Sequence, residues 1–382
     1  MGPSLSLGSI AGIRVGVHWS WLVVFALLVW TLSTGVFDAT NPDLSEGTRI
    51  AIAVVASVLF FVSVLLHEFG HALQARRERI EIEGITLWLF GGVAQLRGGF
   101  ESAGAEFRIA VAGPIVSLGL GIVFVAMALV GLPEAADAVV AWLGYVNLSL
   151  LVFNLVPAVP LDGGRILHAA LWQVRGDFGW ATRIGAALGR GFGYVLIAGG
   201  IALFVFAGDF SGAWLVFLGW FLLMAATSEA RYVAAREALA GLRVRDLMTR
   251  DPVTVPSHVT LGHLVDNVLW PRRFTTYPVV DDGRVVGLLP FRCVAQVPRT
   301  EWDVRTVRDC MLALDDLPLL DEDDEAIVAL EKVGSSEVNR ALVLDGDRLV
   351  GLLSITDLAR ALEAAPRRRP PAAGDAAPRA AI

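Results

Sequence analysis

Long uncharged stretches dominate the first two thirds of the chain. A helix needs about 20 apolar residues to cross the hydrocarbon core of a bilayer, and a charged side chain placed there is costly. Five runs of 18 to 25 residues contain no Asp, Glu, Lys or Arg: 15–37, 109–133, 138–161, 191–208 and 210–228. A sixth run, 50–75, has one formal charge, Glu68. The pattern predicts a polytopic α-helical membrane protein with about six transmembrane helices.

Arginine is distributed unevenly between the connections. The connections at 76–108 and 162–190 carry nine arginines, whereas those at 38–49, 134–137 and 209 carry only Arg49. Short loops rich in Arg stay on the cytoplasmic side. We therefore expect a multi-pass protein of the plasma (cell) membrane with both termini in the cytoplasm. The segments 67–71 and 154–165 are then expected at the same, cytoplasmic, membrane face.

The composition becomes that of an ordinary soluble domain after Glu229, and this part contains a duplication. Val-Arg-Asp-Leu-Met at 244–248 returns as Val-Arg-Asp-Cys-Met at 307–311, and Val-Val-Gly-Leu-Leu at 285–289 returns as Leu-Val-Gly-Leu-Leu at 349–353. A near-constant offset marks an internal repeat, and each copy predicts a short helix and a strand–turn–strand unit. The predicted organisation is a membrane domain at 1–230, two α/β motifs at 240–300 and 301–365, and a disordered tail at 366–382.

Charge and cysteine content exclude several classes of function. Only 18% of the residues are charged and the net charge is −7, so a nucleic-acid partner is not expected, because phosphate binding requires a basic surface. The two cysteines, Cys293 and Cys310, are too few for a disulfide framework or a cysteine-based zinc site.

The charged sixth run contains a metal-binding pattern, His-Glu-Phe-Gly-His at 67–71. On a helix, His67 and His71 share one face and can chelate a cation, whereas Glu68 lies about 100° away and reaches a water molecule. Two imidazoles suit zinc, and a catalytic zinc site needs a third protein ligand and an open position. Asp162, in Pro-Leu-Asp-Gly-Gly at 160–164, is the best placed acid, with Gly163 and Gly164 allowing a close turn around a metal.

These residues resemble the site-2 protease (M50-type) family of intramembrane zinc metalloproteases. The resemblance covers roughly residues 10–230 and rests on the motif at 67–71, on Ala-Gly-Pro at 112–114, and on Asn-Leu-Val-Pro-Ala-Val-Pro-Leu-Asp-Gly at 154–163. It implies that His67, His71 and Asp162 bind Zn²⁺, that Glu68 is the general base, and that Asn154 lies near the scissile carbonyl.

The resemblance further implies single-pass membrane proteins or membrane-associated regulators, such as anti-sigma or pro-sigma factors, as substrates cut within or near a transmembrane helix. A helical substrate has to unwind locally before its carbonyl can react. Residues 84–96 contain β-prone residues around Gly91 and Gly92, and they predict a hairpin lining a protein cavity. Such a hairpin either pairs with an unwound substrate or lies at the periphery without a substrate role.

The duplicated region resembles a pair of cystathionine-β-synthase (CBS) motifs, a module that often binds ATP or AMP and that implies a possible homodimer. Ser354, Thr356 and Asp357 match the nucleotide-contacting pattern, Asp357 for ribose hydroxyls and the other two for phosphate. The first copy has Pro-Phe-Arg-Cys at 290–293 and lacks the acid, so at most one good cleft is expected. In the alternative interpretation, Ser354 or Thr356 merely caps the following helix.

Two other functions remain open at this level. CBS pairs also accompany ion transporters and channels, in which His67, Glu68, His71 and Asp162 would bind an ion in transit. A catalytically silent membrane binding protein would also carry the same pattern. The sequence favours a zinc endopeptidase that performs regulated intramembrane proteolysis under the control of a CBS pair.

Overall fold

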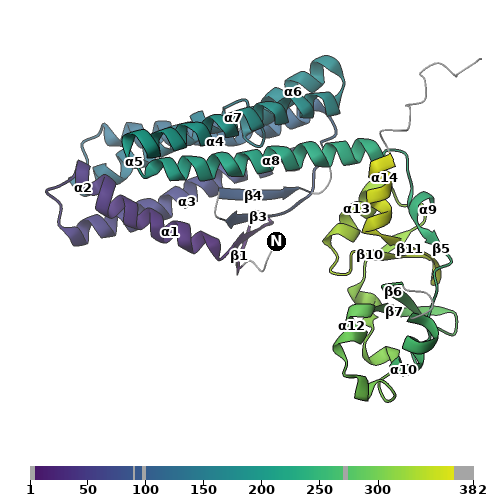
Figure 1. Ribbon diagram of the computed structural model, residues 1–382. Helices are drawn as coiled ribbons and strands as arrows, with labels where there is room; N and C mark the ends of the chain where they lie inside the picture. The colour runs from purple at the N-terminus through teal and green to yellow at the C-terminus, as the bar shows by residue number, and fades with distance from the viewer. Residues whose placement is uncertain (1–4, 89–90, 97–99, 270–273, 365–382) are drawn as a thin grey trace, which may run out of the picture. The chain divides into compact units, whose positions relative to one another are not determined.

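The computed structural model describes residues 5–88, 91–96, 100–269 and 274–364, and it divides into two compact units, Met1–Arg231 and Tyr232–Ile382. Figure 1 shows long helices in the first unit and short helices and strands in the second. The tail predicted at 366–382 lies outside the described residues.

Six helical segments of the described chain are long and apolar enough to cross a membrane, as predicted. The first combines α1 (Ser20–Thr31), the π-helical η1 (Leu32–Val36) and α2 (Phe37–Thr40). The others are α3 (Glu46–Arg77), α4 (Ala103–Ala128), α5 (Glu134–Asn154), α7 (Phe178–Ala207) and α8 (Ser211–Leu239). Several extend beyond the uncharged runs, because arginine at a helix end can reach out to the polar interface.

Helix α3 is the most enclosed of these segments. Its most apolar window is 44% buried, against 11 to 33% for the other five. Small side chains at Ala53, Ala56 and Ser57 are fully buried, and they allow the close helix approach that packing inside a membrane favours. Ser45 caps the start of the helix, and its hydroxyl accepts a hydrogen bond from the Thr48 amide at 3.2 Å. The helix that carries the His-Glu-x-x-His pattern is therefore the most enclosed of the six apolar segments.

A four-stranded sheet packs beside α3, in the order β1 (Leu5–Ile10), β2 (Ile13–Val17), β3 (Ile82–Trp88) and β4 (Gly91–Leu96). Strands β3 and β4 form the predicted hairpin, whereas β2 and β3 are parallel. Buried Ile13, Val15 and Ile85 pack on Phe69 and Ala72 of α3. The first uncharged run, 15–37, therefore contains the end of β2 as well as the helical span, because a buried apolar strand and the start of an apolar helix look alike in sequence.

Two features shape the remainder of this unit. The 14-residue helix α6 (Asp162–Arg175) is too short to span a bilayer and follows the loop at 155–161. Helices α7 and α8 approach so closely that a Cβ atom on Gly193 would lie 2.8 Å from the Gly219 carbonyl oxygen, and one on Gly219 would lie 2.6 Å from the Gly193 carbonyl oxygen. Glycine is required here because the two backbones nearly touch.

The second unit consists of two interleaved copies of the repeat. The predicted strand pairs are β6 (Thr276–Asp281) with β7 (Arg284–Pro290), and β10 (Arg340–Asp345) with β11 (Arg348–Ser354). Each sheet also takes a short strand from the other copy, since β5 (Thr249–Arg250) pairs with β11 and β8 (Leu312–Ala313) pairs with β7. The remaining elements are β9 (Leu319–Asp321), α9 (Val244–Leu247), α10 (Leu261–Leu264), η2 (Val265–Leu269), α12 (Phe291–Gln296), η3 (Arg299–Glu301), η4 (Val307–Asp309), η5 (Leu314–Asp316), α13 (Ala326–Ser335) and α14 (Ile355–Ala364).

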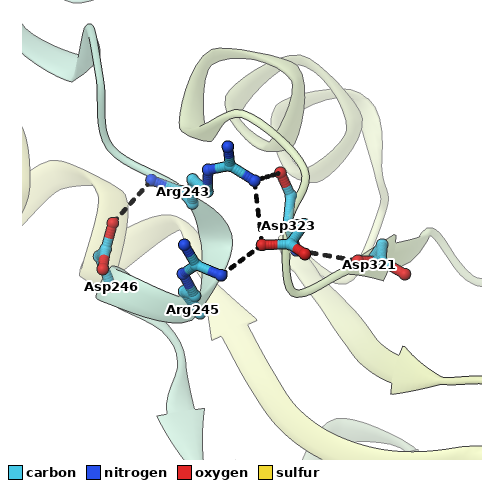
Figure 2. Close-up of polar contacts among 5 residues, drawn as sticks. All are labelled: Arg243, Arg245, Asp246, Asp321 and Asp323. Atoms are coloured by element: carbon cyan, nitrogen blue, oxygen red, sulfur yellow. Dashed lines mark hydrogen bonds and ion pairs between the residues drawn. The ribbon is translucent and has the colours of Figure 1, made fainter.

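The segment before α9 docks on the acidic turn that follows β9 (Figure 2). The guanidinium groups of Arg243 and Arg245 both contact the Asp323 carboxylate, at 3.0 and 2.5 Å. Backbone bonds from Val244 to Asp324 and from Arg245 to Glu322 complete the contact. The acidic run at 321–325 is thus partly engaged in holding the two copies of the repeat together.

Candidate metal centre

The two histidines of the pattern face each other on α3. Their Nε2 atoms are 3.2 Å apart and the ring planes are inclined at 78°. His67 is buried, and the His71 side chain is 13% exposed. The separation of four residues along the helix accounts for this geometry, because positions i and i+4 lie on one face.

Asp162 brings the third ligand-type group from α6. One carboxylate oxygen lies 3.1 Å from His67 Nε2, and the other lies 3.3 Å from His71 Nε2. Within the described residues, this trio is the group of His, Cys, Asp and Glu side chains whose ligand atoms converge, all within 4.8 Å of one another. Asp162 lies in the first turn of α6, where the helix dipole favours a carboxylate.

Helix α4 holds both rings from behind. The His71 Nδ1 atom donates a hydrogen bond to the Ile109 carbonyl oxygen at 2.7 Å. This bond places the proton of a neutral ring on Nδ1 and leaves the Nε2 lone pair directed at the cluster. His67 Nδ1 lies 2.8 Å from the Ser117 hydroxyl. Hydrogen bonds of this kind on the far nitrogen orient metal-binding histidines.

Gly113 of α4 makes room for the imidazoles. A Cβ atom at this position would overlap His71 Nε2 and would lie 2.7 Å from His67 Nε2. Gly70 of α3 plays the reciprocal part, since a Cβ there would lie 2.8 Å from the Ala112 carbonyl oxygen. The α3–α4 contact therefore depends on glycine on both sides, and the Ala-Gly-Pro motif at 112–114 has a structural reason.

The donor set fits zinc. Zinc binds histidine nitrogen and carboxylate oxygen at about 2.0–2.2 Å in tetrahedral geometry, which separates neighbouring ligand atoms by about 3.3–3.5 Å. The three closest separations here, 3.1, 3.2 and 3.3 Å, are near that range. Three protein ligands leave a fourth position for water or substrate, as catalytic zinc sites require.

Glu68 lies next to this cluster and touches the hairpin. A Cβ atom built on Gly92 of β4 would overlap Cγ of Glu68 and would lie 2.9 Å from its carboxyl carbon. Strand β4 thus passes directly against the Glu68 side chain. A larger residue at position 92 would displace the Glu68 side chain from this position.

The loop before α6 explains the other predicted residues. Asn154 is the last residue of α5 and is half-buried. Gly163 and Gly164 lie against the backbone of Leu155–Val156 and Ala158–Val159. They therefore let the 155–161 loop fold back closely on the start of α6, where Asp162 lies.

Sequence reasoning did not find Ile109 and Ser117 as partners of the two histidines. Ile109 contributes only its backbone carbonyl group, which no side-chain pattern reveals. A serine inside an apolar run is a usable signal, because polar side chains in membrane helices tend to contact other helices.

Ser354, Thr356 and Asp357, which match the nucleotide-contacting pattern of CBS motifs, line a cavity of about 250 Å³ in the second unit. Thr249, Phe274 and Thr276 line it as well. Ser354 and Asp357 also bond to each other. The Asp357 carboxylate accepts from the Ser354 hydroxyl at 2.5 Å and from its amide at 3.0 Å. Both the capping contact and a position beside a cavity are therefore present. A second cavity, of about 350 Å³, is lined by Pro290, Phe291 and Arg292 of the first copy, among others.

Comparisons with known proteins find a matching family for each of the two parts of the chain. The model of peptidase family M50 matches residues 55–136 and 132–198, and the CBS domain model matches 244–297 and 306–364. Two relatives carry the name "Putative zinc metalloprotease": Rip3 of Mycobacterium tuberculosis, 37% identical over 369 residues, and sll0528 of Synechocystis, 30% identical over 373 residues. The alignments cover 95% of this chain and 94% and 96% of the two relatives.

The solved structure of the site-2 protease from Methanocaldococcus jannaschii is similar to part of this chain. It is 30% identical, with a TM-score of 0.44, covering 60% of this chain and 96% of that one. The full-length relatives and the two family matches decide the identity: the chain belongs to peptidase family M50 and is a site-2-protease-like zinc metalloprotease with a CBS pair.

Proposed function

We propose that the protein is an intramembrane endopeptidase in which His67, His71 and Asp162 bind Zn²⁺ and Glu68 acts as general base. Its substrates are transmembrane or membrane-associated regulatory proteins, with anti-sigma and pro-sigma factors as the expected class. The observation that carries this proposal is the convergence of two imidazole Nε2 atoms and one carboxylate within 4.8 Å on α3 and α6. Ionisable groups such as His67, Glu68 and His71 on a membrane helix are costly and usually functional.

Zinc, when bound, polarises a carbonyl group and acidifies water. The residues of the chain perform the proton transfers. Glu68 takes a proton from the attacking water as the C–O bond forms, and it gives this proton to the amide nitrogen as the C–N bond breaks. Contacts with Ser117 and Ile109 hold the rings of His67 and His71 in their orientation. The two imidazoles therefore do not have to move while Glu68 transfers the proton.

The position of strand β4 favours binding of the substrate as an extended strand. It is the last strand of the sheet, with β3 as its neighbour among the described strands. Its Gly92 contacts Glu68, so a substrate segment that added to the β4 edge would pass beside the general base. Addition of a strand to a sheet edge supplies the backbone bonds that an unwound transmembrane segment has lost.

Asn154 is proposed to bind the substrate near the scissile carbonyl. It is the C-terminal residue of α5, separated from Asp162 by the 155–161 loop. No described residue is recorded as a hydrogen-bond partner of its side chain. A half-buried amide without such a partner has donors and an acceptor left for a substrate backbone.

Replacement of Glu68 by Gln tests the mechanism. The purified Glu68→Gln protein should bind zinc in the same ratio as the wild type but should fail to cleave a co-expressed membrane substrate, with a rate loss of about 100-fold or more. Quantitative mass spectrometry of membrane peptides that accumulate uncut would identify the substrate. Unchanged proteolysis in this variant contradicts the proposal.

The proposed placement is in the plasma membrane with both termini in the cytoplasm. It is supported by the nine arginines in the connections at 76–108 and 162–190. We assign residues 1–230 to the protease domain, and 240–300 and 301–365 to the two CBS motifs. Accessibility of cysteines introduced at either end to an impermeant reagent in whole cells and in lysed cells tests the orientation.

We further propose that the CBS pair binds ATP or AMP through Ser354, Thr356 and Asp357 and modulates cleavage. These residues line the 250 Å³ cavity, and one Asp357 oxygen faces Arg360 at 3.5 Å while the other is engaged by Ser354. Titration of the full chain with each nucleotide by calorimetry tests binding. Size-exclusion chromatography with light scattering tests the proposed homodimer formed through the CBS pair.

A further inference from the structure

The first unit contains a second group of buried, hydrogen-bonded polar side chains, separate from the candidate metal cluster. Glu106 of α4 lies 2.7 Å from His168 Nδ1 of α6, and His168 Nε2 lies 2.9 Å from the Thr182 hydroxyl of α7. The three residues are only 2 to 4% exposed. Phe178 covers the imidazole edge-on at a centroid distance of 4.8 Å. Three helices are therefore joined by one continuous chain of hydrogen bonds.

The local structure of α4 does not explain why Glu106 is buried in this hydrogen-bonded group. Glu106 lies in the first turn of α4, where a carboxylate interacts favourably with the helix dipole. That interaction is available at the surface and does not require burial. Burying a carboxyl and an imidazole in a membrane protein is costly unless they are paired, and such residues usually serve a site.

The position of Glu106 on α4 connects it to the metal cluster. Glu106, Ile109, Gly113 and Ser117 follow one another at intervals of three, four and four residues, so they lie along one face of the helix. Ile109 and Ser117 hold the two imidazoles, and Gly113 makes room for them. The same face of α4 therefore contacts α3 through the histidines and α6 through Glu106.

Helix α6 carries Asp162 at its N-terminus and His168 six residues later, about 9 Å along the axis. The hydrogen bonds of His168 to α4 and α7 consequently limit the rotation and sliding of α6. Helix α7 restrains the preceding loop as well, because Gly185 and Gly189 lie against Val159. The position of Asp162 is thus restrained both by the loop before it and by His168 after it.

We propose that the Glu106–His168–Thr182 chain is a positioning device that sets the Asp162 carboxylate at the correct distance from His67 and His71. None of the three residues touches the metal or the substrate. The inference rests on the metal ligands proposed above and adds residues that maintain their geometry. Helix α4 acts as the common reference, since it fixes the two imidazoles and, through Glu106, the helix that carries the third ligand.

The test uses the full chain in detergent, with Zn²⁺ affinity measured against a chromophoric chelator and site geometry measured by the visible spectrum of the Co²⁺-loaded protein. Glu106→Leu should lower Zn²⁺ affinity about 10-fold and change the Co²⁺ bands. Glu106→Gln keeps an acceptor oxygen for His168 Nδ1 and should recover most of both. The matched control is Glu78→Leu, which removes the ion pair of Glu78 with Arg108 of α4 and should leave both readouts unchanged.

A second control separates positioning from general destabilisation. Leu143→Ala empties a fully buried position on α5 and should lower thermal stability without altering the Co²⁺ spectrum. The inference is overturned if Glu106→Leu binds metal like the wild type, if Glu106→Gln is as weak as Glu106→Leu, or if Leu143→Ala weakens binding equally. A wild-type protein that binds no metal would instead refute the proposed function itself.

Discussion

The polar clusters of the two units differ in what their hydrogen-bonding atoms face. In the membrane unit, the Nε2 atoms of His67 and His71 and the Asp162 carboxylate all face one another, an arrangement that a cation in the centre stabilises best. In the CBS unit, Ser354 and Asp357 satisfy each other at the start of α14. A nucleotide therefore has to compete with a contact that is already made, and we expect zinc to bind far more tightly than nucleotide.

The largest expected effect is at the cluster itself. Asp162→Asn keeps the volume but removes the negative charge and one ligand-type oxygen. Zn²⁺ affinity should fall by more than about 100-fold, because the loss of a ligand costs more than the loss of a residue that only supports one. Metal analysis after dialysis against a chelator measures this. Stoichiometric zinc in the variant would show that Asp162 is not a ligand.

The next effect concerns the space that α4 leaves for the rings. Gly113→Ala introduces a Cβ that overlaps His71 Nε2, so Zn²⁺ affinity should fall about 10- to 100-fold. The matched control is Gly119→Ala on the same helix, where the added Cβ meets nothing within 4 Å. Equal metal binding by both variants would contradict the role given to Gly113.

In the CBS unit, substitutions should have smaller effects. Substitutions of Asp357 should separate its contact at the start of α14 from its proposed role in nucleotide binding. Asp357→Ala removes both the carboxylate that accepts from the Ser354 amide and hydroxyl at the start of α14 and the proposed ribose contact, and loss of the first contact costs about 1 kcal/mol of stability. Asp357→Asn keeps a capping oxygen but changes the charge that faces the ribose. If Asp357 binds nucleotide, calorimetry should show weaker ATP or AMP binding in both variants, with a lower melting temperature mainly in Asp357→Ala. Unchanged binding in both would leave Asp357 with the capping role alone.

The smallest effect is expected at the Ser257–Asp281 contact of the first copy. The Ser257 hydroxyl donates to the Asp281 carboxylate at 2.5 Å and the Ser257 amide at 2.9 Å, and these bonds lower the Asp281 pKa. A lowered folded-state pKa stabilises the fold above the unfolded pKa, near 4, and the gain is lost as the pH falls through the folded value.

Ser257→Ala should therefore cost about 1 kcal/mol at neutral pH, and progressively less as the pH falls below the unfolded pKa of an aspartate, near 4. Hydrogen exchange of the β6 region in the full chain measures this, with the wild type at both pH values as reference. A destabilisation that does not depend on pH would contradict the electrostatic explanation.

Several features were predictable because they depend on residues close together in the chain. The spans follow from the lengths of uncharged runs, and the His67–His71 pair follows from the helical repeat. The β3–β4 hairpin and the strand pairs of the CBS motifs follow from β-prone residues around turns. The β1–β2 hairpin escaped prediction because Ile13–Val17 joins directly onto an apolar run, and its parallel pairing with β3 is a contact between distant segments.

The amino-acid sequence by itself determined the membrane spans, the placement of His67 and His71 on one helix face and the repeated α/β module, because hydropathy, helical spacing and internal repetition are properties of neighbouring residues. Only the tertiary structure decided that α4 orients both imidazoles, that Gly92 lies against Glu68, and that Glu106 pairs with His168. These contacts join residues tens of positions apart, and their geometry depends on how closely helices and strands approach, which local patterns do not encode.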